Sequence, residues 1–443
     1  MKTTILRRRG LRVLALGVLA AAGAACTDFL VAENPGAVEE VDLNQPAYIG
    51  LLTNGVVGDF QLVASWINYY GALYTDELYN THVFFEERLF DTRDVTEANG
   101  TYSFFLYSRL HRARYQADNI AARLRIILAD SAGRDTRLAM VYAYAGYNYI
   151  YLGEHLCESP IDVSAPLPPS ELFTRAIARF DSAILVANAA KAHPGASAGT
   201  IQRADSIINF ASVGAARAAL NMNDLTVAID YAEDVPAAFR WDMHFSENSS
   251  TEFNMWYGRL STLNSGSNSA TISFTPFEAM DGDPRIPRPD TTEAAMNGLS
   301  IFIPNSPLAF STYSGTDDGA DFDESSDIRL ASGLEAQYIV AEASGATPET
   351  RAFVDARRAV GNLLPMPVGA TDAEVMAELR EQRRRDLYLD GHRMGDLRRY
   401  LEFYGIDDWP TGPYPNTTIG DVYLPNYCWP LTIAELNGNP NIP

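Results

Sequence analysis

Cysteine and histidine are scarce in this chain of 443 residues, which contains three cysteines and six histidines. Cys26, Cys157 and Cys428 are too widely spaced for a zinc ribbon or a CxxC redox motif, and the histidines form no HxxxH pair. The sequence therefore predicts no transition-metal site, and nothing in it indicates a cofactor.

The chain also lacks two short motifs that mark nucleotide-binding enzymes. It has no P-loop and no Rossmann fingerprint. Glycoside hydrolases use a pair of carboxylates, but with 56 Asp and Glu residues such pairs are abundant here. Their presence is therefore no evidence of catalysis. We expect a protein that is not an enzyme, with a secreted glycoside hydrolase as the weakest alternative.

Positively charged residues are few: the chain has 34 Lys and Arg residues and 56 Asp and Glu residues, which gives a net charge of −22. Residues 1–25 hold five of the cations and no acid, so the remaining 29 cations leave the rest of the chain at −27. Such a surface repels nucleic acid and anionic lipid. We expect no nucleic-acid partner, and neutral or cationic ligands are favoured.

Long apolar runs are absent too, and the one short run lies near the N-terminus. It covers residues 13–25, follows a basic segment and ends at Cys26, as in a signal peptide. The small residues before Cys26 resemble a bacterial lipobox, although Gly23 stands where Leu is usual, and ordinary cleavage with a free Cys26 remains the alternative. We expect residues 1–25 to be a lipoprotein signal peptide, and the mature chain to be held at the membrane by lipid on Cys26 without spanning it.

Residues 26–240 are predicted to form a mainly helical region, because apolar residues recur there at helical spacing. Small residues such as Ala215 and Ala228 stand where two helices approach closely, which favours tetratricopeptide-like helix pairs. The predicted helices cover residues 46–58, 60–73, 102–128, 136–152, 169–189, 207–221 and 225–232.

Aromatic residues are concentrated between Trp66 and Phe90. Those from Trp66 to Tyr74 have helical spacing, and we expect them in the core. The following rings interleave with amides and carboxylates in a predicted loop, a mixture that suits a sugar or peptide site. Tyr79, Phe84 and Phe85 are therefore candidate ligand contacts, with a core role as the alternative.

Residues 241–443 are expected to form a loop-rich segment followed by C-terminal helices, packed as one globule with the N-terminal region. Helical periodicity is lost over residues 240–328, and a long irregular stretch of this kind is usually functional or disordered. Its rings argue for order, and Trp256 and Tyr257 complete the candidate ligand contacts. The acidic run at 317–324 has oxygen ligands for calcium but not the EF-hand spacing, so a solvated loop is favoured.

Helices are predicted again at 328–343 and 349–360. Residues 381–400, which we call the signature segment, are predicted to lie in two helices joined by a turn. A helix is expected from Thr371, with Glu374 completing a capping box, to the break at Asp390 and Gly391. A second helix should follow, with Met394, Leu397, Leu401 and Tyr404 on one face. Arginines and carboxylates alternate along both, which predicts an ion-pair lattice that joins the two helices and does not contact ligand.

The signature segment resembles the C-terminal motif of the SusD/RagB family of outer-membrane nutrient-binding lipoproteins. The matching positions are Arg383, Arg384, Leu387, Gly391, Arg393, Asp396, Leu397 and Arg399. Gln382, Asp386, Asp390 and Tyr400 depart mildly from it. Asp283-Pro284-Arg285 and the segment after Cys26 also agree with the family's habits.

This resemblance implies a mostly α fold of tetratricopeptide-like helix pairs, with a long loop-rich insertion and few short strands. It also implies a function: a lipid-anchored protein of the outer membrane, facing the exterior, that captures a glycan or peptide and passes it to a TonB-dependent transporter. A helical-repeat scaffold that binds another protein without a small ligand remains the alternative.

Cys157 and Cys428 are predicted to form a disulfide. The signal peptide directs the chain to an oxidising compartment, and lipid on Cys26 leaves an even pair. Two buried, unpaired thiols are the alternative.

Overall fold

The computed structural model falls into two units, residues 1–48 and residues 49–443. In the first, the described elements are the short 3-10 turns η1 (Asp42–Asn44) and η2 (Pro46–Tyr48). All that follows concerns the second unit. The structure describes residues 40, 42–249, 252–260, 269–280, 282–286, 293–294, 300–301, 325–415 and 420–442.

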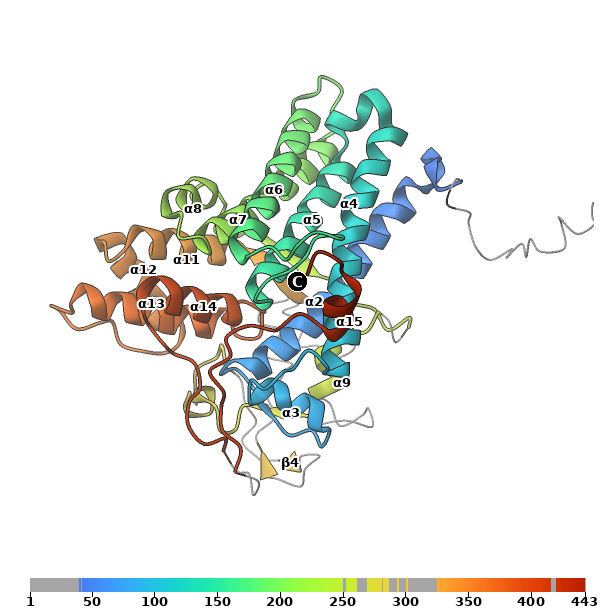
Figure 1. Ribbon diagram of the computed structural model, residues 1–443. Coiled ribbons are helices and arrows are strands. Elements are labelled where there is room, and N and C mark those ends of the chain that lie inside the picture. Colours follow the sequence, from blue (N-terminus) through green and yellow to red (C-terminus); the bar gives the residue numbers. More distant parts are fainter. Residues whose placement is uncertain are drawn as a thin grey trace, which may run out of the picture. The chain divides into compact units, whose positions relative to one another are not determined.

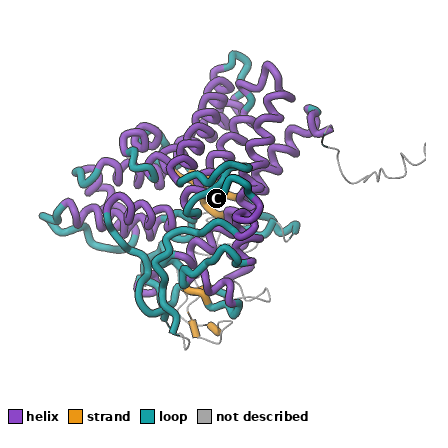
Figure 2. The backbone as a smooth tube through the Cα atoms, in the orientation of Figure 1, coloured by secondary structure: helices purple, strands orange, loops and turns teal. Residues whose placement is uncertain are grey.

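The second unit is mostly helical, as predicted (Figure 2). Its α-helices are α2 (Ile49–Tyr74), α3 (Phe85–Asp91), α4 (Ser108–Leu128), α5 (Thr136–His155), α6 (Pro169–Ala192), α7 (Ala198–Leu220), α8 (Leu225–Ala232), α9 (Met255–Leu260), α11 (Gly333–Ser344), α12 (Pro348–Val360), α13 (Asp372–Asp386), α14 (Arg393–Tyr404) and α15 (Ile433–Gly438). Shorter helical turns are the π-helical η3 (Tyr102–Tyr107) and the 3-10 turns η4 (Ala129–Arg134) and η5 (Pro276–Ala279).

Strands are few and short, also as predicted. Among the described residues they form two-stranded antiparallel sheets, in which β1 pairs with β3, β2 with β6 and β4 with β5. Their bounds are β1 (Tyr79–Asn80), β2 (Arg240–Met243), β3 (Ala270–Thr271), β4 (Glu293–Ala294), β5 (Ser300–Ile301) and β6 (Ile328–Ser332).

Helices α4 to α8 pack mainly on their neighbours in sequence, and α4 to α7 lie side by side in Figure 1. Phe180 of α6 shows why small residues recur at these contacts. A Cβ atom on Gly146 of α5 would lie 2.5 Å from the Phe180 ring, and one on Gly214 of α7 would lie 2.3 Å from it. Only glycine allows α5 and α7 to approach this ring so closely, so the helix pairs depend on both positions.

The two helices predicted at 46–58 and 60–73 are one continuous helix, α2, and the predicted break near Asp59 is wrong. Phe60 is fully buried and meets the rings of Tyr144 and Tyr151 on α5 at 5.3 and 5.4 Å. Burial of this ring holds the helix together across Gly55 and Gly58, although glycine has a low helix propensity.

Two other predicted helix starts are wrong. The helix predicted at 328–343 begins with β6, which pairs with β2, and α11 starts after the cap Ser332. Strand pairing satisfies the backbone of β6 and buries all of its residues, so tertiary packing overrides the apolar periodicity. Helix α7 begins at Ala198, nine residues before the predicted start, where Ser197 caps it.

The capping box of Thr371 and Glu374 at the start of α13 is confirmed. The helix ends at Asp386, however, and not at Asp390. The carbonyl of Asp386 accepts a hydrogen bond from Arg329, and the N–H of Leu389 donates to Glu77 at 2.9 Å. Because these contacts occupy groups that another helical turn would need, the chain turns earlier, with a positive φ at Leu389 and Gly391.

The ion-pair lattice predicted between the two signature helices is present. Asp396 of α14 accepts from Arg383 of α13 at 2.7 Å and from Arg399 at 2.8 Å, and all three side chains are buried. Burial alone would raise the pKa of Asp396, but the charges of Arg383 and Arg399 hold it well below its usual range.

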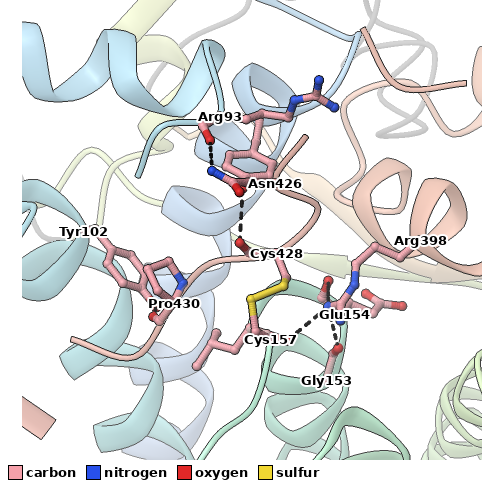
Figure 3. Close-up of a disulfide and its surroundings, with 11 residues drawn as sticks. Arg93, Tyr102, Gly153, Glu154, Cys157, Arg398, Asn426, Cys428 and Pro430 are labelled. Atoms are coloured by element: carbon pink, nitrogen blue, oxygen red, sulfur yellow. Dashed lines mark hydrogen bonds between the residues drawn. A yellow bond between two sulfur atoms is a disulfide. The ribbon is translucent and has the colours of Figure 1, made fainter. Parts of the chain in front are cut away.

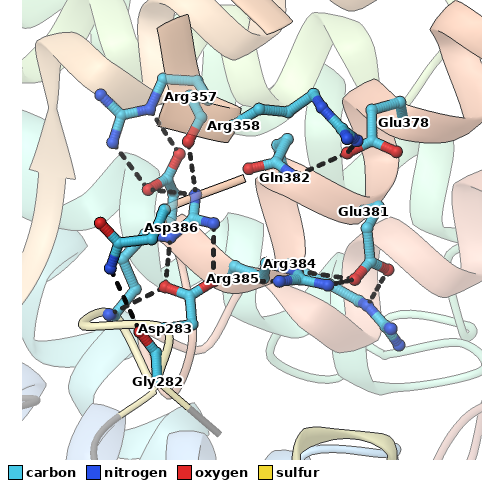
Figure 4. Close-up of polar contacts among 12 residues, drawn as sticks. Gly282, Asp283, Arg357, Arg358, Glu378, Glu381, Gln382, Arg384, Arg385 and Asp386 are labelled. Carbon is cyan, nitrogen blue, oxygen red and sulfur yellow. Dashed lines mark hydrogen bonds and ion pairs between the residues drawn. The ribbon is translucent and has the colours of Figure 1, made fainter. Parts of the chain in front are cut away.

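The same lattice extends beyond the two helices. This extension was not predicted. Arg393 forms a bidentate pair with Asp76 just after α2, at 2.6 and 2.8 Å, and Arg399 pairs with Glu342 of α11. Asp386 accepts from Arg357 of α12 (Figure 4). It also accepts from Arg285. The signature segment thus ties together parts of the chain that are remote in sequence.

The predicted disulfide between Cys157 and Cys428 is confirmed, with Cα atoms 5.0 Å apart (Figure 3). It joins the end of α5 to the tail, by which we mean residues 405–442. The neighbouring Trp429 is fully buried and exchanges backbone hydrogen bonds with His155 and Cys157. Arg398 of α14 donates to the carbonyls of Gly153, Glu154 and Leu156 and so caps the end of α5 beside the disulfide.

Candidate functional site

Exposed rings lie at the N-terminal end of α3 and on η3, and we call them and the rings they contact the aromatic surface. Phe84, Phe85 and Phe104 are 62, 61 and 63% exposed. Glu86 joins the two segments that carry them, because its carboxylate accepts from the backbone of Gly100 and Thr101 just before η3. Large exposed apolar groups that cluster in this way mark binding surfaces.

Further rings continue the aromatic surface inward. Phe105 stacks on the half-buried Trp66 of α2 with ring centroids 4.8 Å apart, and Phe104 meets Phe105 edge-on at 5.0 Å. The Arg109 guanidinium lies 5.0 Å from the Phe105 ring centroid and 5.6 Å from that of Phe104. These contacts fix the orientation of the rings before any ligand arrives.

Polar groups lie next to these rings. Arg259 of α9 lies over Trp66 at 5.3 Å and pairs with Glu87 of α3 at 2.9 Å. His82 packs against Phe84, and its Nδ1 accepts the Phe84 N–H at 3.0 Å. Burial lowers the pKa of His82 although Glu87 opposes this, so the imidazole is neutral at pH 7.

Two of the predicted ligand contacts, Phe84 and Phe85, thus lie on the aromatic surface. Tyr257 lies in α9, but its side chain is outside the described part of the chain. Phe104, Phe105, Arg109 and Arg259 were missed. Phe104 and Phe105 are consecutive in a helical segment, so they could not both face the core. This spacing could have indicated that one of the two rings is exposed.

Tyr79 and Trp256, also predicted as ligand contacts, are instead buried in the core. Tyr79 is 3% exposed, stacks on Tyr414 at 4.8 Å, and donates from its hydroxyl to the carbonyl of Pro415 at 2.7 Å. Trp256 is fully buried and packs edge-on against Tyr69. The predicted loop after α2 contains strand β1, whose pairing with β3 carries Tyr79 inward. The expectation of a core role is confirmed for Tyr69, Tyr70 and Tyr74, but not for Trp66, which is only half-buried.

A separate cavity of about 590 Å³ lies between α13, the residues after α2, and the tail. We call it the charged cavity, because Arg380, Glu381 and Arg384 line it from α13 and Arg393 and Asp76 line it nearby. Trp409, Tyr423 and Phe274 supply rings to its wall. Two residues of the signature segment, Arg384 and Arg393, therefore border open space as well as joining the lattice.

Asp91, at the end of α3, is a buried carboxyl that links this helix to the tail. It accepts from the backbone of Asn80 and from the hydroxyl of Tyr414, both at 2.6 Å. Burial raises its pKa from 3.8 to about 7, although both hydrogen bonds act in the opposite direction.

Asp91→Asn is expected to change how stability depends on pH. The pKa of Asp91 is higher in the folded protein than in the unfolded chain, so the protonated carboxyl stabilises the fold. This contribution is fully present below pH 3.8 and is lost as the pH rises through about 7. Because Asn does not titrate, the variant should gain stability relative to the wild type over this window. Thermal melts across the window measure it, and a constant difference between the two proteins would contradict the expectation.

In the described part of the chain, no helix has the length and apolar character needed to cross a bilayer. The same residues contain no group of three or more His, Cys, Asp or Glu side chains arranged to hold a metal ion.

Neither a scan against protein-family models nor a search of curated proteins finds a match to this chain. Solved structures do match. A surface glycan-binding protein A from Bacteroides uniformis has a TM-score of 0.62 and 13% identity, over 90% of this chain and 98% of that one. A laminarin-binding SusD-like protein has a TM-score of 0.60 and 15% identity, over 87 and 97% of the two chains.

A SusD-like protein from Bacteroides fragilis NCTC 9343 matches with a TM-score of 0.65 and 10% identity, over 91% of this chain and 97% of its own. Each of the three matches covers nearly the whole of both chains. The chain therefore has the SusD-like fold.

Proposed function

We propose that this chain is a member of the SusD/RagB family that captures a glycan at an outer-membrane surface and passes it to a TonB-dependent transporter. The observation that carries the proposal is the aromatic surface, displayed on a fold shared with proteins described as binding glycans. The resemblance of the signature segment supports the same family.

The aromatic surface has the chemistry that sugars need. Phe84, Phe85 and Phe104 offer ring faces on which the apolar faces of sugars stack. Arg109 and Arg259 lie over neighbouring rings and carry N–H donors that suit sugar hydroxyls. Rings held by their own contacts lose little conformational entropy on binding, which favours capture without a deep pocket.

Phe84→Ala combined with Phe85→Ala is expected to weaken glycan binding by about tenfold or more, since each aromatic contact contributes about 0.5–1.5 kcal/mol beyond the area it buries. Both rings are exposed, so the melting temperature should change little. Calorimetric titration of the mature domain, with soluble glucans such as laminarin among the probes, measures both quantities.

Leu185→Ala is the matched control for this experiment, because Leu185 is 71% exposed on α6 and lies outside the aromatic surface. It should bind as the wild type does. Full affinity in the double phenylalanine variant would overturn the assignment of the site.

Membrane anchoring is the second part of the proposal, and it depends on Cys26, which lies outside the described residues. Cys26→Ser removes the thiol that lipid would modify. The wild type is expected in the membrane fraction and the variant in the soluble fraction, because the variant would lack the lipid that holds the wild type at the membrane. Identical partitioning of the two proteins would refute lipidation.

A further inference from the structure

We propose that the charged cavity is a second binding site, which takes a sugar ring bearing a carboxylate, such as a uronate residue. Its volume of about 590 Å³ is within the usual range for small-ligand sites. The proposal goes beyond the capture of glycans at the aromatic surface and does not depend on it.

The arginines of the cavity are not equivalent. Arg393 is held by Asp76 in a bidentate pair, and Arg384 pairs with Glu381 at 2.5 Å and with Asp76 at 3.4 Å. Arg380 lies one helical turn before Arg384 on the same face of α13. Its contact within the described chain is the ring of Tyr400, 5.6 Å from the guanidinium carbon.

The ring of Tyr400 stabilises the charge of Arg380 but accepts no more than a weak hydrogen bond from it. No carboxylate or carbonyl oxygen of the described residues lies within hydrogen-bonding distance of this guanidinium. Arg380 therefore presents N–H donors to the cavity, and a carboxylate is the group that such a fork recognises best.

Other groups on the wall suit the body of a sugar ring. Trp409 is 3% exposed and lines the cavity, and its indole Nε1 has no acceptor among the described residues. A buried donor without an acceptor is costly, and a ligand oxygen would satisfy it. Asp408, next to it in the tail, is exposed and can accept sugar hydroxyls.

Phe274 supplies an exposed ring at this cavity. It is 41% exposed and has a φ of 69°, a conformation that bulky residues rarely adopt. Its N–H donates to Glu278 at 2.8 Å, and this hydrogen bond helps to hold the strained turn. Strain of this kind is maintained where a side chain must be presented in one orientation, and here it places a ring where a sugar can stack.

The charge of the whole chain helps to define the ligand. A net charge of −22 repels polyanions from the surface at large, so an anionic sugar needs a local cation that is not already neutralised. Arg380 meets that requirement, whereas Arg384 and Arg393 are compensated by the carboxylates they contact.

Calorimetric titration with trigalacturonic acid and with its methyl ester tests the proposal, since the ester keeps the shape and removes the charge. The wild type should bind the acid at least about tenfold more tightly than the ester, because charge-assisted hydrogen bonds are roughly twice as strong as neutral ones. Arg380→Met should abolish that preference, and Arg380→Lys should retain part of it.

Arg175→Met is the matched control, because Arg175 is exposed on α6 and does not line the cavity. The variant with Phe84→Ala and Phe85→Ala should still prefer the acid, which separates this site from the aromatic surface. Equal affinity for acid and ester, no binding of the acid at millimolar concentration, or an unchanged preference in Arg380→Met would each overturn the proposal.

Discussion

Arg393→Ala is expected to lower the free energy of unfolding by about 3–5 kcal/mol, because it removes one partner of a buried, bidentate ion pair. Arg393 and Asp76 are 4 and 6% exposed. Burial alone would raise the pKa of Asp76, and the charge and hydrogen bonds of Arg393 instead lower it below 3.8. In the variant, the ion pair that remains to Asp76 is the longer one with Arg384, at 3.4 Å.

Denaturant unfolding measures this loss, and Arg112→Ala is its control. Arg112 is 67% exposed and pairs with Asp59 at 3.1 Å, so its removal should cost less than about 1 kcal/mol. Adding Asp76→Ala to the Arg393 variant should restore part of the loss, because no uncompensated charge then remains buried. If Arg393→Ala were as mild as the control, the lattice would not have the stabilising role that we assign to it.

Reduction of the disulfide, or replacement of both Cys157 and Cys428 by Ser, is expected to cost about 2–5 kcal/mol. The bond closes a loop between residues 271 positions apart, so its loss frees the unfolded chain considerably. Hydrogen exchange should show the effect first in the tail, where the backbone of Trp429 bonds to His155 and Cys157 beside the bridge.

Alkylation of the denatured, unreduced protein provides the direct check on this bond. With Cys26 replaced by Ser, no thiol should react before reduction and two should react after it. Two reactive thiols in the unreduced protein would show that Cys157 and Cys428 are not joined. An unchanged exchange rate in the tail of the Ser variants would show that other contacts hold it.

Features that depend on residues close together in the sequence, such as helix caps and ion pairs between neighbouring helices, could be predicted. The capping box of Thr371 and Glu374 lies in α13 as expected, because cap and acid are three residues apart. The pairing of Asp396 with Arg383 and Arg399 follows from alternating charges on two neighbouring helices. Phe84 and Phe85 are exposed beside polar side chains, in keeping with their mixed surroundings in the sequence.

Contacts between remote segments could not be predicted in the same way. The pairing of Arg393 with Asp76 spans more than three hundred residues, and no spacing rule relates the two. Burial of Tyr79 follows from β1 pairing with β3 across the loop-rich segment. The unbroken course of α2 depends on Phe60 reaching the rings of α5, where tertiary packing outweighs the helix propensity of two glycines.

The central claim is that this SusD-like chain captures glycans through rings on its surface. The most direct measurement is a binding screen of the mature domain against an array of glycans and peptides, run in parallel with the variant carrying Phe84→Ala and Phe85→Ala. We predict saturable binding of at least one class of glycan by the wild type, with the signal lost in the variant. Binding to no glycan at all, or glycan binding that the variant retains in full, would contradict the claim.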